Sequence, residues 1–146
     1  MRNILFICTG NSARSIMAEA YLNHVAAGRW RAFSAGSSPT GAPNPFAIST
    51  LAGRRIDPGA PASKSWDRFA EPNAPPMDVI VTVCDNAAGE VCPIWPQRAG
   101  RSPTILHWPF PDPAAAAGDD AAKQAAFDSV FIQIKSRIDA FLKDDA

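Results

Sequence analysis

The sequence predicts an α/β fold: a doubly wound sandwich in which helices flank a four-stranded parallel sheet. Short apolar segments alternate with longer segments of helical periodicity, which is the order that βαβ units produce. The apolar segments hardly alternate with polar residues, as is typical of strands buried on both faces. There is no internal repeat, and neither side of the Pro-rich stretches 57–62 and 71–76 could stand alone. We therefore expect one domain over residues 1–146.

Four elements are predicted in the first part of the chain. Residues 3–8 are apolar and predict a buried strand, and residues 15–27 predict the helix that follows it. Residues 30–35 predict a second strand. Residues 43–55 predict a second helix, which an Asn-Pro pair opens, because proline is well tolerated at the first helical position.

Three elements are predicted in the rest of the chain. Residues 79–84 are almost wholly apolar and rich in β-branched side chains, which favours a strand inside a parallel sheet. Residues 104–107 predict a short fourth strand. Residues 119–143 predict a long final helix, because apolar side chains recur there about every 3.6 residues. Asp119 or Asp120 could cap this helix.

The turn between the first strand and the first helix reads Cys8-Thr-Gly-Asn-Ser-Ala-Arg-Ser15. A turn of small residues that runs into a helix N-terminus directs backbone N–H groups and partial positive charge at one spot. Such a turn can bind a tetrahedral oxyanion. The residues expected to line it are Thr9, Gly10, Asn11, Ser12, Ala13 and Arg14.

The residues of this turn also suit a nucleophilic thiol. Cys8 would lie beneath the bound anion, where the local field helps a thiol to ionise and to attack the central atom. Arg14 offers a planar fork to two oxygens, and the Ser15 hydroxyl can bond the thiolate and cap the helix. Gly10 and Asn11 tolerate the positive φ that a tight turn needs. The alternative is a buried strand cysteine followed by an ordinary turn.

Two more candidate residues follow the carboxyl ends of predicted strands and therefore belong to the same sheet edge. In parallel sheets, ligands bind at this edge. Cys84 ends the third predicted strand, and Asp112 lies shortly beyond the fourth. If the first and third strands are neighbours, their axes lie about 4.8 Å apart. Cys8 and Cys84 could then pair with modest movement. Asp112 precedes Pro113, and the alternative for it is a plain Asp-Pro turn.

Cys92 follows Cys84 after seven intervening residues that are polar and contain a glycine. A segment with so few apolar anchors can rearrange at low cost, which favours a redox role for the two thiols. They could also be two unrelated cysteines. A zinc pair is conceivable, but the spacing is wrong and no histidines accompany it.

The N-terminal Cys-x5-Arg-Ser, followed by Met17-Ala18-Glu19, resembles the low-molecular-weight protein tyrosine phosphatases. The turn is still more similar to that of the arsenate reductases built on the same scaffold, which reads Cys-Thr-Gly-Asn-Ser-x-Arg-Ser. The resemblance covers essentially the whole chain and implies the fold of that family. Further matches are Ser34-Ala35-Gly36, Asn44-Pro45-x-Ala47, Cys84, Cys92, His107-Trp108 and Asp112-Pro113.

The resemblance implies that arsenate binds in the turn, where Cys8 attacks arsenic and Asp112 protonates the departing oxygen. Cys84 would then attack Cys8 and release arsenite, and Cys92 would capture Cys84. An external thiol protein, thioredoxin or glutaredoxin, would reduce the resulting disulfide, and no cofactor would be needed. One alternative is a phosphomonoester phosphatase that forms a phosphocysteine on Cys8. Another is a non-catalytic redox or oxyanion sensor.

The chain departs from the family pattern at three places. Ala114 follows Asp112-Pro113 where the tyrosine phosphatases usually have tyrosine, which removes a stacking wall for an aryl substrate. Ala13 stands where many relatives have another cysteine. Some of the reductases bind potassium, but Ser65 replaces an expected aspartate, so we expect no metal. The loosely matching residues are Asn11, Glu19, Ser34 and Ser63, of which Glu19 would otherwise support the turn or face solvent.

Bulk properties set the remaining expectations. The chain carries 14 basic and 14 acidic residues, which gives no electrostatic case for nucleic acid or an anionic membrane. No apolar run approaches the ~20 residues that span a bilayer, and the first strand leaves no room for a signal peptide. We therefore expect a cytoplasmic protein, most simply a monomer. Thiols are kept reduced in that compartment, so the three cysteines suggest chemistry rather than a structural disulfide.

Overall fold

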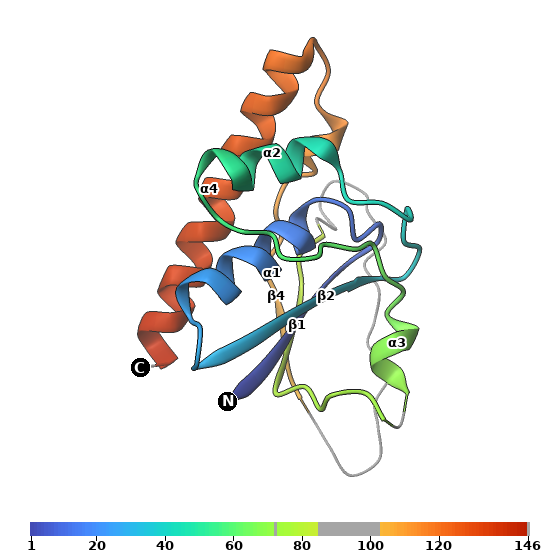
Figure 1. The fold of residues 1–146 in the computed structure, drawn as a ribbon, viewed down its shortest axis with the longest axis vertical. Coiled ribbons are helices and arrows are strands. Elements are labelled where there is room, and N and C mark those ends of the chain that lie inside the picture. Colours follow the sequence, from blue (N-terminus) through green and yellow to red (C-terminus); the bar gives the residue numbers. More distant parts are fainter. Residues whose placement is uncertain (72, 85–102, 146) are drawn as a thin grey trace.

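The computed structural model describes residues 1–71, 73–84 and 103–145. Its centre is a parallel sheet of four strands, as the sequence predicts, and the strand order is β2-β1-β3-β4 (Figure 1). The first and third strands are neighbours, so the carboxyl ends of β1 and β3 meet at one edge. The strands are β1 (Arg2–Cys8), β2 (Trp30–Gly36), β3 (Val79–Thr82) and β4 (Thr104–His107).

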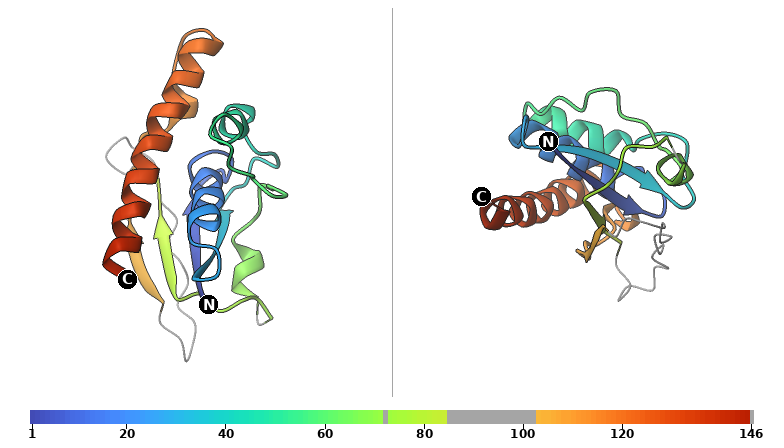
Figure 2. Two further views of the ribbon diagram at one scale, coloured as in Figure 1. Left: turned by 60° about the vertical axis from the view of Figure 1, so that its left-hand side comes forward. Right: turned by 90° about the horizontal axis from the view of Figure 1, so that it is seen from below.

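Helices lie on both faces of this sheet. In the described parts of the chain, α1, α2 and α4 pack on one face and the short α3 lies on the other (Figures 1 and 2). The helices are α1 (Arg14–Val25), α2 (Pro45–Gly53), α3 (Asp67–Ala70), α4 (Asp120–Asp145) and the 3-10 helix η2 (Pro113–Ala115).

The core on the α1 side fixes the end of β1. Residues 4–7 of β1 are fully buried, and successive side chains point to opposite faces. Ile4, Phe6 and Cys8 belong to the cluster shared with α1 and α4, whereas Leu5 and Ile7 belong to the smaller cluster near α3. Because both faces of β1 are packed, the strand delivers Cys8 to the sheet edge in one orientation.

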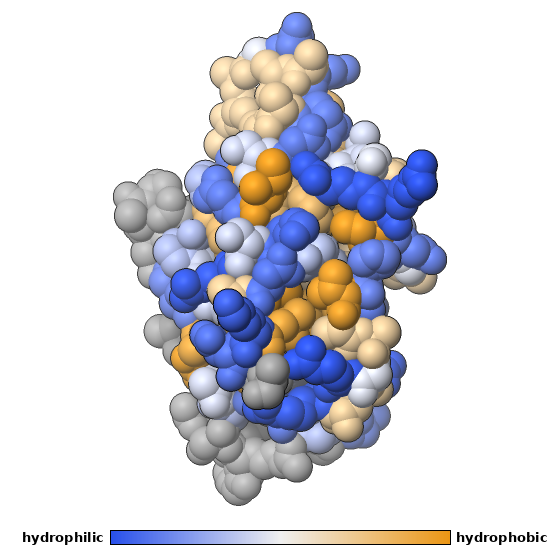
Figure 3. Space-filling model, turned by 90° about the vertical axis from the view of Figure 1, so that its left-hand side faces the viewer, coloured by the Kyte–Doolittle hydropathy of each residue, from blue (hydrophilic) through white to orange (hydrophobic). Residues whose placement is uncertain are grey.

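The apolar stripe of α4 faces inward, as its periodicity predicts. Phe127, Val130, Phe131, Ile134 and Ile138 are each no more than 3% exposed. On the side of the molecule where α4 lies, hydrophilic residues lie between the strongly apolar patches, and a broader, weakly apolar area covers the upper end (Figure 3). Among the described residues, no helix is both long and apolar enough to cross a membrane.

The observed boundaries differ from the predicted ones by a few residues. α1 ends two residues early, and Gly28 (φ +87°) lies in the turn that leads into β2. β3 ends at Thr82 rather than at residue 84, because its partner β1 pairs with it only as far as Ile7. The four-residue α3 and the 3-10 helix η2 were not predicted; neither is long enough to show a periodic pattern.

Two of the predicted helix caps are present, but Ser15 does not cap α1: it lies inside this helix, whose N-cap residue, Ala13, makes no side-chain cap hydrogen bond. The Asn44 side chain accepts from the N–H of Phe46 at 2.9 Å, with Pro45 as the first residue of α2. Asp119 is the residue that caps α4, since its Oδ1 accepts from the N–H of Ala122 at 2.9 Å.

Candidate active site

The turn of residues 8–15, called the thiol loop below, wraps around the sulfur of Cys8. Asn11 has a φ of +46°, which folds the loop back so that its own N–H donates to Cys8 Sγ at 3.2 Å. Ser15 Oγ lies 3.1 Å from the same sulfur. Cys8 is 3% exposed and is a free cysteine. A buried sulfur that faces two donors is in a setting where negative charge on it is stabilised.

The direction of the Ser15 proton follows from the Asn11 amide. The backbone N–H of Lys64 donates to Asn11 Oδ1 at 2.7 Å, which fixes the amide orientation because an N–H can only donate. Asn11 Nδ2 therefore donates to Ser15 Oγ, at 2.8 Å. Since Ser15 Oγ accepts that bond, its own proton is available for Cys8 Sγ.

Arg14, the first residue of α1, connects the thiol loop to the segment after β4. The residue is 7% exposed, and its Nη1 donates to the carbonyl oxygen of Phe110 at 3.0 Å. Phe110 lies two residues before Asp112, so this hydrogen bond links the first residue of α1 to the segment that leads to that carboxylate. This arrangement restrains the guanidinium without removing it from the pocket, which it lines.

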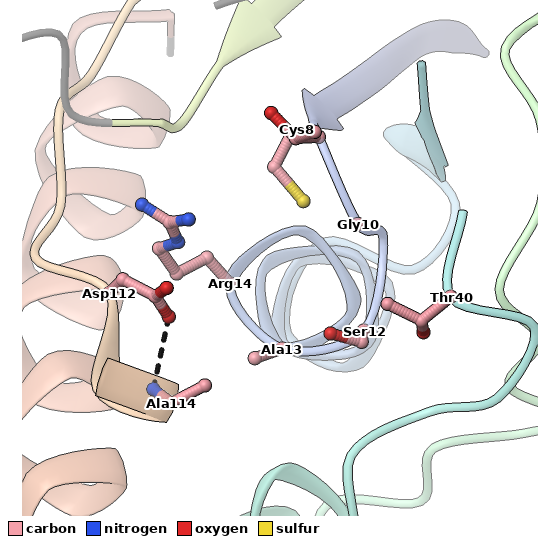
Figure 4. A pocket seen from close by; sticks show the side chains of 9 residues that line it. Cys8, Gly10, Ser12, Ala13, Arg14, Thr40, Asp112 and Ala114 are labelled. Carbon is pink, nitrogen blue, oxygen red and sulfur yellow. Dashed lines mark hydrogen bonds between the residues drawn. The ribbon is translucent and has the colours of Figure 1, made fainter. Parts of the chain in front are cut away.

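Cys8, Arg14 and Asp112 line one pocket of about 460 Å³. Figure 4 shows Arg14 and Asp112 on one side of this pocket and Thr40 on the other. Asp112 is half-buried, and its Oδ1 accepts from the N–H of Ala114 at 3.0 Å, which caps η2 (Figure 4). The other lining residues are Thr9, Gly10, Ser12, Ala13 and Ala114.

The two remaining predicted thiols are placed differently. Cys84 is fully buried, lies two residues beyond the end of β3 and is disulfide-bonded. It is not among the residues that line the pocket with Cys8. Cys92, with the whole 85–92 segment, lies outside the described residues.

One conformational expectation for the loop was wrong. Gly10 does not have a positive φ; only Asn11 does. Gly10 instead provides space, because a Cβ there would lie 3.2 Å from the methyl group of Thr40. The carbonyl of Gly10 accepts from the N–H of Thr40 and from the hydroxyl of Ser63, both at 3.0 Å. The loop is therefore held by contacts from outside it as well as by its own turn.

Gly36, the last residue of β2, lets the thiol loop pack against that strand. A Cβ at Gly36 would lie 2.4 Å from the carbonyl oxygen of Thr9 and 3.0 Å from the N of Asn11. Only glycine fits this approach. Gly36 belongs to one of the family matches in the sequence, but nothing in its pattern predicts this role.

Lys64 is a second residue that sequence reasoning missed. Its Nζ donates to the carbonyl oxygen of Ala62 at 2.7 Å and to Ser34 Oγ at 3.4 Å. Ser34 in turn donates to Glu19 Oε1 at 2.9 Å, so Glu19 supports this cluster rather than facing solvent. Burial raises the pKa of Glu19, opposed by the charge of Lys64, and burial lowers the pKa of Lys64, opposed by Glu19.

These contacts bear on the potassium site of some relatives. A lysine ammonium already occupies the space beside Glu19 and Ser34, so the residues present do not fit a free monovalent cation there. The described residues also include no cluster of three or more His, Cys, Asp or Glu side chains that could hold a metal ion.

Comparison with known proteins identifies a matching family model and similar named proteins. Residues 3–144 match the family model of the low molecular weight phosphotyrosine protein phosphatases. The arsenate reductase of Halalkalibacterium halodurans is 38% identical over 94% of this chain and 93% of its own length. That of Bacillus subtilis is 37% identical over the same shares.

Solved structures show the same fold. The arsenate reductase of Archaeoglobus fulgidus superposes with a TM-score of 0.68 and 27% identity, over 92% of this chain and 98% of the other. A tyrosine phosphatase of Erwinia amylovora gives a TM-score of 0.72 at 18% identity, over 98% and 92%. With a family model that spans nearly every residue, the chain belongs to the low molecular weight phosphotyrosine protein phosphatase family, alongside relatives that are named arsenate reductases.

Proposed function

We propose that this protein is a cytoplasmic enzyme that reduces arsenate to arsenite. The observation that carries the proposal is the buried Cys8 sulfur, which faces two hydrogen-bond donors at the floor of a pocket that Arg14 also lines. A tetrahedral oxyanion in that pocket would meet the loop N–H groups and the guanidinium. The named arsenate reductases among its relatives support the choice of arsenic over other central atoms.

The first step forms a bond between sulfur and arsenic. The Cys8 thiolate attacks arsenic(V), and protonated Asp112 gives its proton to the departing oxygen, which leaves as water. Arg14 and the loop N–H groups hold the remaining oxygens. Arsenic is still pentavalent in this adduct.

The second step transfers the electrons. A Cys84 thiolate attacks the sulfur of Cys8, an S–S bond forms, and the electron pair of the S–As bond goes to arsenic, which leaves as arsenite. Cys92 then attacks Cys84, which frees Cys8 as a thiolate. An external dithiol protein such as thioredoxin or glutaredoxin reduces the Cys84–Cys92 disulfide. The balance is two thiols oxidised for each arsenate reduced.

The cysteine states support this order. Cys84 is disulfide-bonded whereas Cys8 is a free thiol. The proposed reaction would produce this combination of thiol states after arsenite has left and before the external reductant acts.

The second candidate is hydrolysis of a phosphomonoester through a phosphocysteine on Cys8. The family membership and the carboxylate of Asp112 in the pocket favour it, because Cys8, Arg14 and Asp112 would suffice. The pocket itself argues against an aryl ester. Its lining contains no aromatic side chain among the described residues, and Ala114 and Thr40 stand at its walls.

The two candidates separate in one paired assay. Arsenate-dependent oxidation of reduced thioredoxin is measured beside hydrolysis of an aryl phosphate, for the wild type and for Cys84→Ser. We expect arsenate reduction in the wild type, its loss over multiple turnovers in Cys84→Ser, and residual hydrolysis in both. If Cys84→Ser reduces arsenate at the wild-type rate, the disulfide steps are wrong. Hydrolysis without any arsenate reduction would establish the phosphatase instead.

A further inference from the structure

We propose that the Lys64 ammonium is a built-in cation that positions the thiol loop from behind, so that the enzyme needs no free monovalent cation. The inference rests on the proposed function, since it concerns how the thiol of that reaction is held. Lys64 is a positioning residue here: it does not line the pocket that contains Cys8.

The side chain of Lys64 is anchored at its tip. Its Nζ donates to the carbonyl oxygen of Ala62 and to the hydroxyl of Ser34, which is fully buried. The Glu19 carboxylate accepts from the same hydroxyl and attracts the ammonium. Glu19 belongs to α1, which follows the thiol loop, and Ser34 belongs to β2, which packs against the loop through Gly36, so one ammonium links these two elements.

The backbone of Lys64 passes this anchoring to the loop. Its carbonyl oxygen accepts from the N–H of Gly36 at 2.8 Å, and its N–H holds the Asn11 amide at 2.7 Å. Asn11 then orients Ser15 Oγ, and both residues contact Cys8 Sγ. Lys64 is therefore connected to the Cys8 sulfur by a few hydrogen bonds within one compact cluster.

The position of the charge explains why a lysine is used. Glu19 and Ser34 present oxygens to a space behind the loop, and a carboxylate that is partly withdrawn from water is stabilised by a positive partner. A cavity of about 360 Å³ adjoins this space, and Glu19, Asp57, Lys64 and Arg68 are among its lining residues. Without the lysine side chain, a small cation could enter from that cavity. With it, the cation is covalently part of the protein.

The first test measures the reactivity of Cys8. The rate of alkylation by iodoacetamide is followed by mass spectrometry on the Cys8-containing peptide, from pH 5 to 9, in reduced protein. Lys64→Met keeps the apolar stem but removes the charge. We expect it to slow alkylation at neutral pH by about 2- to 30-fold and to move the profile to higher pH, because the Asn11–Ser15 contacts loosen. Lys64→Arg should retain most of the wild-type alkylation profile. Lys143→Met, at an exposed position near the end of α4, should leave the profile unchanged.

The second test replaces the cation. Lys64→Ala opens the space beside Glu19, and alkylation is compared in KCl and in tetramethylammonium chloride at equal ionic strength. The wild type should react equally in both salts, whereas the variant should be slow in tetramethylammonium and faster in potassium. Thermal unfolding shows which variants fold. Lys64→Met provides the reactivity result if Lys64→Ala does not.

Each contrary outcome has a defined meaning. A wild-type alkylation profile in Lys64→Met would overturn the positioning role. Potassium dependence of the wild type, or a Lys64→Ala variant that potassium does not speed, would overturn the built-in cation. Because alkylation involves no arsenate, a protein that shows the expected alkylation results but does not reduce arsenate would refute only the proposed function.

Discussion

The two sides of the thiol loop use charged side chains in opposite ways. On the pocket side, Arg14 and Asp112 line the cavity in which we propose that an oxyanion binds. On the back side, Glu19 and Lys64 are engaged with each other and with Ser34. The pocket side therefore offers groups to a ligand, and the back side holds the loop that presents them.

The difference shows what a reactive thiol requires from its surroundings. Donors aimed at a developing charge are effective when they need no reorganisation at the moment of reaction. The loop supplies such donors, but its short turn cannot fix them alone. Lys64, Ser63 and Thr40 fix it from outside, through bonds to Asn11 and Gly10. Substitutions on the pocket side should thus abolish or slow the reaction, whereas substitutions on the back side should disturb the position of the thiol loop.

The largest expected effect is that of Cys8→Ser on the pocket side. Serine keeps the contacts with the loop but is a far weaker nucleophile at neutral pH, so arsenate reduction and any aryl phosphate hydrolysis should both disappear. The two assays named above measure this. Calorimetric titration with phosphate should still detect binding, since Arg14 and the loop N–H groups remain. Arsenate reduction or phosphate ester hydrolysis by this variant would refute the role of Cys8 as the nucleophile.

The next effect is that of Asp112→Asn, which removes an acid but keeps a cap. Asparagine can still accept from the N–H of Ala114, so η2 and the segment before it should stay in place. We expect kcat to fall by about 10²–10⁴, the usual share of general acid catalysis. Phosphate affinity should change little or rise slightly, because a negative charge leaves the pocket. An unchanged kcat would return Asp112 to the role of a turn residue.

The contrast between the two sides also explains what the sequence could predict. The pocket side is mostly one contiguous stretch, residues 8–15, whose turn and helix start are visible in the order of the residues. Asp112 could be added because parallel strands end at one edge, a rule that needs no knowledge of contacts. The four-strand sheet was predictable because each of its strands is a local apolar run in the sequence.

The back side was not predictable, since its contacts join residues far apart in the chain. Lys64 and Asn11 are separated by 53 positions, and the bond uses the backbone N–H of Lys64, which no side-chain pattern reveals. Gly36 matters through the closeness of Thr9, also a backbone contact. The error at Gly10 has a similar origin. Glycine and asparagine both tolerate positive φ, and only the packing against Thr40 decides which of them uses it.

Gly36→Ala tests the back side by geometry alone, and its effect should be smaller than those of the two pocket variants. The new Cβ would lie 2.4 Å from the carbonyl oxygen of Thr9, so either β2 or the thiol loop must shift. We expect a loss of about 1–3 kcal/mol in the free energy of unfolding and weaker phosphate binding. Urea denaturation and calorimetry measure these two quantities.

Gly53→Ala is the matched control for this change. A Cβ at Gly53, the last residue of α2, would meet nothing within 4 Å, and Gly53 is not among the described glycines with positive φ. Alanine there should leave phosphate binding unchanged and raise stability slightly, by about 0.4–1 kcal/mol. If both glycine variants behave alike, the close approach at Gly36 does not constrain the loop.

The smallest effect is expected at a charge cluster on α4, away from both sides of the loop. Asp139 accepts hydrogen bonds from Lys135, at 2.8 Å, and from the hydroxyl of Tyr21. Burial raises the pKa of Asp139, but these two bonds and the charge of Lys135 outweigh it, so the pKa lies below its ordinary value of 3.8. The folded protein thus keeps this carboxylate charged to lower pH than the unfolded chain does. Its contribution to stability is present above pH 3.8 and is lost as the pH falls through the folded-state pKa.

Asp139→Asn should therefore lower the Tm at pH 7 by at most about 2 °C, because the Lys135 pair is exposed and screened. The difference from the wild type should shrink toward zero in the most acidic buffers in which both proteins still fold, and arsenate reduction at pH 7 should be unchanged. Thermal scans across acidic and neutral buffers measure the first result, and the thioredoxin assay the second. Lowered activity in this variant would mean that charges remote from the thiol loop also hold it, and the contrast between pocket side and back side would then be too narrow a description of what positions Cys8.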